Sequence, residues 1–149
     1  KWNNGIGWVR YMKRNILFVL LLSLLSVILI GCQSNEHNGL PDGNLSKVSI
    51  SKSSGFGKVN SDFFTVYEDK ETLNIFKNAI SNAVKSEGIA DMAEPKFNIE
   101  VIYTDGNKED YHLWVGEKGQ KSTLMDVNDT HTIYTISEEI TNQLIDLVK

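Results

Sequence analysis

Cysteine is nearly absent from this sequence of 149 residues, in which Cys32 is the single example. The part of the chain after Cys32 therefore has neither a disulfide framework nor cysteine ligands for a metal, and its fold must depend on a hydrophobic core. The sequence also lacks a Gly-x-Ser-x-Gly motif. We therefore do not expect a hydrolase with a serine or cysteine nucleophile.

Basic residues are also few after Cys32, where 11 of them stand against all 19 acidic residues, giving a formal charge of −8. Nucleic-acid binding requires clustered lysine and arginine, so no nucleic-acid partner is expected. The same charge disfavours a domain that lies flat on anionic lipid. The glycine-rich segment 54–58 lacks the spacing of a P-loop and is interpreted as a plain loop.

The longest apolar run is short, covering the 15 residues from Ile16 to Ile30 with two serines inside it. At about 1.5 Å per residue it falls short of a bilayer core of roughly 30 Å. Lys13 and Arg14 precede the run, and basic residues stay on the cytoplasmic side of a membrane. This combination is typical of a signal peptide.

The apolar run ends in Leu29-Ile30-Gly31-Cys32, which resembles the lipobox of bacterial lipoproteins. The thiol of Cys32 can accept a diacylglycerol group as a thioether, and Gly31 leaves room for a peptidase that cuts before the modified cysteine. We expect a protein held through diacylglyceryl-Cys32 on the outer face of the cell membrane, in an envelope of Gram-positive type. The alternative is an uncleaved membrane anchor with an inert cysteine.

The chain is thereby divided into four parts. Residues 1–11 are an upstream extension or a mis-assigned start, residues 12–31 the signal peptide, residues 32–46 the lipidated cysteine and a flexible tether, and residues 47–149 a single domain.

Hydrophobic periodicity predicts strands at 47–51, 63–67, 97–103, 111–115, 122–127 and 132–136. A helix should start at Asp69 and end at Gly88, with Val84 in its buried stripe, and a second helix should follow Ser137. Asp105-Gly106 and Asn128-Asp129 are hairpin turn signals. The prediction is an α+β fold in the order β-β-α-β-β-β-β-α, with an antiparallel sheet of about five to six strands and two helices on one face.

The alternation along 111–115 directs His112 and Trp114 away from the helices, onto the same face as Ile102. Left exposed, these three residues would form an apolar binding patch for an envelope protein or a small ligand. Alternatively, the loop at 53–60 or the connection at 89–96 folds over the patch and buries it. We expect a non-enzymatic binding or accessory module without a cofactor.

Two further functions remain open. His112 and His131 lie on predicted neighbouring strands with aspartates nearby, and could belong to a metal-binding protein or a metal-dependent enzyme. Asp129 also has a plain role as a turn residue, which favours a structural interpretation. The third possibility is an inhibitor of an envelope hydrolase.

Four segments resemble small lipoproteins of Bacillus-type bacteria that carry a YhfM-like domain. They are Gly88-Ile89-Ala90-Asp91-Met92 with Pro95 after it, Tyr111-His112-Leu113-Trp114, and Asp129-Thr130-His131-Thr132-Ile133-Tyr134. The similarity covers most of residues 47–149. It implies a lipid-anchored extracytoplasmic protein, and it brings no known activity, ligand or catalytic residue.

Overall fold

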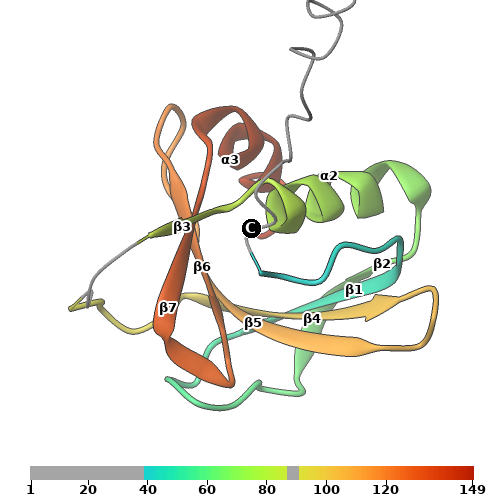
Figure 1. Ribbon diagram of the computed structural model, residues 1–149, viewed down its shortest axis with the longest axis horizontal. Helices are drawn as coiled ribbons and strands as arrows, with labels where there is room; N and C mark the ends of the chain where they lie inside the picture. Colours follow the sequence, from blue (N-terminus) through green and yellow to red (C-terminus); the bar gives the residue numbers. More distant parts are fainter. Residues whose placement is uncertain (1–38, 87–90) are drawn as a thin grey trace, which may run out of the picture. The chain divides into compact units, whose positions relative to one another are not determined.

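The computed structural model describes residues 39–86 and 91–149, which belong to a compact unit from His37 to Lys149. The predicted signal peptide, the lipobox and Cys32 lie outside the described residues. The described part is an α+β fold with two helices and a seven-stranded antiparallel sheet, one strand more than the upper end of the predicted number (Figure 1). The fold class is therefore confirmed.

The sheet has the strand order β2-β1-β4-β5-β6-β7-β3. In chain order the elements are β1 (Leu45–Lys52), β2 (Phe63–Tyr67), α2 (Lys70–Ser81), β3 (Val84–Ser86), β4 (Phe97–Tyr103), β5 (Lys108–Trp114), β6 (Ser122–Asp126), β7 (Asp129–Ile136) and α3 (Glu138–Leu144).

Both predicted hairpins are confirmed. The turn between β4 and β5 contains Gly106 at φ +90, a conformation that glycine adopts without steric cost, and its N–H donates to the carbonyl of Tyr103 at 3.0 Å. Asp105 supports the same turn by accepting from the N–H of Asn107 at 2.9 Å. The residues Val127 and Asn128 join β6 to β7. These short connections place β4 to β7 side by side.

The first helix begins where the sequence predicts and ends earlier. Asp69 is its N-cap and accepts from the N–H of Thr72 at 2.9 Å. The helix stops at Ser81, so the predicted end at Gly88 is wrong. Val84, expected in the buried helical stripe, lies on β3 with 66% of its surface exposed and pairs with Thr135 of β7. Pairing with the free edge of β7 overrides the local helical pattern, and it accounts for the additional strand.

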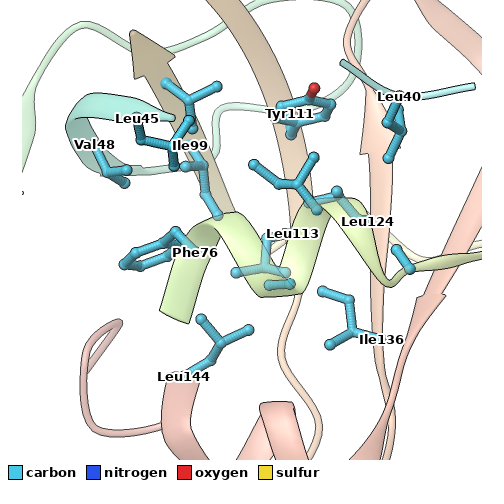
Figure 2. Packing of buried hydrophobic residues seen from close by; sticks show 14 of the residues in the cluster. Leu40, Leu45, Val48, Phe76, Ile99, Tyr111, Leu113, Leu124, Ile136 and Leu144 are labelled. Carbon is cyan, nitrogen blue, oxygen red and sulfur yellow. The ribbon is translucent and has the colours of Figure 1, made fainter. Parts of the chain in front are cut away.

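One face of the sheet, which we call the helix face, packs against α2 and α3 and carries the hydrophobic core. Figure 2 shows Phe76 of α2 and Leu144 of α3 directed at Leu113, Leu124 and Ile136 of the sheet, all nearly or fully buried. Each such side chain contributes roughly 1.5–3 kcal/mol through the hydrophobic effect. The core is the main source of stability, as expected for a domain without disulfides.

The domain starts earlier than predicted, so the tether assigned to 32–46 is too long. Leu40 is 3% exposed and belongs to the core, and β1 already begins at Leu45. The hydroxyl of Tyr103 donates to the carbonyl of Pro41 at 3.2 Å, and the ring of Tyr103 lies against Gly43. A segment with few apolar residues is ordered because Leu40 and Tyr103 give it one apolar contact and one hydrogen bond.

The other face of the sheet carries no helix. The connection between β1 and β2 runs along it, on the side opposite to α2 and α3 in Figure 1. We call it the loop face. Ser49, Ser51, Asn98 and His112 of this face are nonetheless fully buried.

Candidate functional site

Two of the three predicted patch residues come together on the loop face, and the third does not. His112 and Trp114 lie on β5, with ring centroids 6.3 Å apart. Ile102 lies four residues along β4 from Asn98, the cross-strand neighbour of His112, which corresponds to about 13 Å. Its own neighbours are Lys47 and Lys108. Including Ile102 in the patch is therefore wrong.

The patch is covered rather than exposed. The ring of Phe56, from the connection between β1 and β2, lies 5.8 Å from His112 and 6.0 Å from Trp114. The indole N–H of Trp114 donates to the carbonyl of Ala93 at 2.9 Å. Both predicted covering segments therefore contact the site, and the alternative of burial describes it. Phe56, 44% exposed, is the aromatic ring that remains open to solvent.

His112 has both ring nitrogens engaged in hydrogen bonds. Its Nε2 accepts from the backbone N–H of Gly57 at 3.2 Å, and its Nδ1 lies 2.8 Å from Oδ1 of Asn98. Because Nε2 accepts, Nδ1 carries the proton and donates it to Asn98. Burial lowers the pKa of His112 from its ordinary value of 6.5, which favours this neutral form. His112 thus fastens the loop to the sheet and has no free lone pair.

Around His112 lies a cluster of buried polar atoms with few protein partners. Ser51, Asn98 and His112 are successive cross-strand neighbours on β1, β4 and β5. The hydroxyls of Ser49 and Ser51 and the Nδ2 of Asn98 have no hydrogen-bond partner in the described part of the chain. A buried polar group without a partner costs about 1–3 kcal/mol. We call these four residues the loop-face polar cluster.

Charged groups flank this cluster along the next row of the sheet. Lys108 contacts Glu100 at 2.6 Å and Asp110 at 3.7 Å. Burial raises the pKa of Asp110, with Lys108 acting in the opposite direction. The hydrogen bond to Glu100 raises the pKa of Lys108. The lysine offsets much of the negative charge here, so this row does not form a strong cation site.

The predicted metal pair is not assembled. His131 is exposed on β7, near the turn where Asp129 accepts from the N–H of His131 at 3.1 Å, so Asp129 has the plain turn role. His112 offers no free nitrogen. Within residues 39–86 and 91–149 no group of three or more histidine, cysteine, aspartate or glutamate side chains could hold a metal ion.

A second site, which sequence patterns do not indicate, is a groove of about 650 Å³. It lies where β4 begins, β5 ends and α3 gives way to the last residues. We call it the lysine groove because three lysines line it, namely Lys96, Lys118 and Lys149. The three lining segments are far apart in the chain and each is unremarkable alone. A signal appears only once the sheet brings them together.

Comparison with known proteins gives a family and a fold. The family model described as YhfM protein matches residues 43–149. A crystal structure of a thioesterase-like protein from Clostridium sporogenes ATCC 15579 has a TM-score of 0.54 and 22% sequence identity, and the match covers 69% of this chain and 93% of that one. This likeness shows the fold alone. No curated protein matches.

The described helices are all too short or too polar to cross a membrane. The family match starts at residue 43, beyond the lipobox, and spans the whole described sheet with both helices. The resemblance predicted from the four sequence segments is therefore confirmed, and the chain belongs to the YhfM family.

Proposed function

We propose that this protein is a lipid-anchored binding module on the outer face of the cell membrane, without catalytic activity of its own. The observation that carries the proposal is the sequence Leu29-Ile30-Gly31-Cys32 at the end of a 15-residue apolar run with Lys13 and Arg14 before it. Attachment of acyl chains to Cys32 would anchor the domain stably, because more than one chain is needed for lasting membrane association.

The start of the ordered domain agrees with this arrangement. Leu40 is the first core residue, so seven residues separate it from Cys32. A spacer of this length is short, and it would keep the domain close to the membrane surface. The formal charge of −8 after Cys32 favours a domain repelled by anionic lipid headgroups, which would keep its faces accessible to partners.

The absence of catalysis is proposed because the best-placed candidate base is occupied. His112 donates through Nδ1 to Asn98 and accepts through Nε2 from Gly57, so neither nitrogen can take a proton from a substrate without breaking a bond. The thioesterase-like neighbour suggests the assay. We expect the purified protein to hydrolyse butyryl-coenzyme A no faster than buffer, and saturable hydrolysis lost in His112→Leu would contradict the proposal.

The anchor is tested by metabolic labelling with an alkyne fatty acid in cells that express the full chain. The wild type should incorporate label and sediment with membranes at its mature mass. Cys32→Ser should remain unlabelled and keep the mass of the precursor, because the peptidase acts after modification. Ser34→Ala is the matched control, two residues away, and should behave as the wild type.

Two results would reject the anchor. One is label in Cys32→Ser, which would place the modification elsewhere. The other is a Cys32→Ser protein that stays membrane-bound at the mature mass, which would make the thiol irrelevant to processing.

A further inference from the structure

The lysine groove is a preformed hollow of a size that small-molecule sites commonly have. Its volume of about 650 Å³ falls inside the usual range of ≈ 300–1,000 Å³ for ligand pockets. It is open to solvent, and it lies apart from the loop-face polar cluster, with no lining residue in common.

Hydrogen bonds hold the wall of the groove that carries Lys118. The N–H of Gly119 donates to Oδ1 of Asn142 on α3 at 2.9 Å, which ties the turn between β5 and β6 to that helix. At the buried base of the same turn, Thr141 of α3 donates to the hydroxyl of Ser122 at 2.8 Å. The wall is therefore fixed before any ligand arrives, which lowers the entropy cost of binding.

The turn also depends on glycine at one position. A Cβ atom at Gly116 would lie 2.4 Å from the carbonyl oxygen of Lys121, closer than real contacts allow. A larger residue would push the two sides of the turn apart and displace Lys118.

The floor of the groove is apolar. Its members come from both sheet strands and from the chain after α3, and they are Phe97, Val115, Ile145 and Val148. Phe97 and Val115 are only half-buried, although both pack against the core, so part of each remains available to a ligand. Covering this surface with an alkyl chain would gain hydrophobic free energy without moving the core.

The rim of the groove carries positive charge in a domain that is strongly negative. None of Lys96, Lys118 and Lys149 takes part in an ion pair within the described residues, where both ion pairs belong to Lys108. Two carboxylates, Glu117 and Asp146, share the rim. Three ammonium groups beside two carboxylates match a single negative charge better than a multiply charged group.

We propose that the lysine groove binds a monoanionic amphiphile, with its carboxylate or phosphodiester group at the lysines and its alkyl chain on Phe97 and Val115. A fatty carboxylate and a membrane phospholipid share this chemistry. The proposal is independent of the lipid anchor, because every lining residue lies in the domain.

Calorimetric titration tests the charge requirement. A chain of residues 33–149 is suitable, because all strands, both helices and the whole core lie within it. The probes are decanoate, decanol and decyltrimethylammonium below their micelle concentrations. Decanoate should bind at least tenfold more tightly than either other probe, and less tightly as salt is raised. Equal binding of decanol, or of the cation, would overturn the proposal.

Matched variants locate the binding. Lys96→Gln combined with Lys118→Gln should weaken decanoate binding tenfold or more. Lys58→Gln combined with Lys85→Gln removes the same charge from exposed lysines outside the groove and should change it less than twofold. All four positions are exposed, so circular dichroism should show intact folds. Equal losses in the two double variants would leave only a general charge effect and overturn the assignment.

Vesicle flotation separates the two sources. Association with phosphatidylglycerol vesicles but not phosphatidylcholine vesicles, lost in the Lys96/Lys118 variant, would identify a membrane phosphodiester. Decanoate binding without vesicle association would identify a free carboxylate. Failure of both probes would overturn the proposal while leaving the result of the Cys32→Ser labelling experiment unaffected.

Discussion

The helix face and the loop face of the same sheet are both buried, and they achieve burial with opposite chemistry. On β5 the two faces alternate residue by residue, with Tyr111 and Leu113 in the core and His112 between them under the loop. The helix face is stabilised by apolar packing. The loop face buries hydroxyls and an amide, three of whose polar atoms have no protein partner. Stability therefore belongs to one face, and the loop face is available for other work.

The largest effect should come from the helix face. Leu113 is fully buried among core residues, so Leu113→Ala leaves a cavity and should lower the free energy of unfolding by about 2–5 kcal/mol. Urea denaturation followed by circular dichroism measures it. The control is Val66→Ala, which is 47% exposed on the edge strand β2 and should cost within about 0.5 kcal/mol. Similar losses in both variants would show that the face is not the main core.

A smaller loss is expected at the neighbouring residue on the loop face. His112→Leu keeps the bulk of the side chain and removes two hydrogen bonds, leaving Oδ1 of Asn98 and the N–H of Gly57 without partners. We expect about 1–3 kcal/mol of destabilisation at pH 7.5, again by urea denaturation. His131→Leu is the matched control on an exposed position and should stay within about 0.5 kcal/mol. A loss at His112 as large as that at Leu113 would remove the distinction between the faces.

The loop face should also respond to pH. Burial lowers the pKa of His112 in the folded state, so as pH falls through 6.5 the unfolded chain takes up a proton that the folded chain resists. The stability advantage of the wild type over His112→Leu should therefore shrink from pH 7.5 to pH 5. Paired denaturation curves across this range measure the difference. An advantage that grows toward pH 5 would mean that the folded state favours the charged imidazole.

How far the sequence predicts the structure depends on how local each determinant is. Asp69, Ser137 and the turn at Asp105-Gly106 act within a few residues, and all three were predicted correctly. Val84 was misplaced because its partner, Thr135, lies 51 positions away and offers a free strand edge. The periodicity of the helix carries no information about that edge.

The sites were harder to predict for the same reason. Alternation placed His112 and Trp114 on the correct face, but it could not decide whether Phe56 would cover them. The lysine groove needs Lys96, Lys118 and Lys149 to converge, which only the strand order and the position of α3 determine.

The smallest effect should reverse sign at Ser51. Its hydroxyl is fully buried and has no partner in the described residues, so folding removes it from water without compensation from protein groups. Ser51→Ala should therefore be neutral or stabilising by up to about 1 kcal/mol, in contrast to Leu113→Ala. Thermal unfolding of the two variants beside the wild type measures this. Destabilisation of more than about 1 kcal/mol would mean that the hydroxyl has a partner such as a bound water, and that the cluster is satisfied.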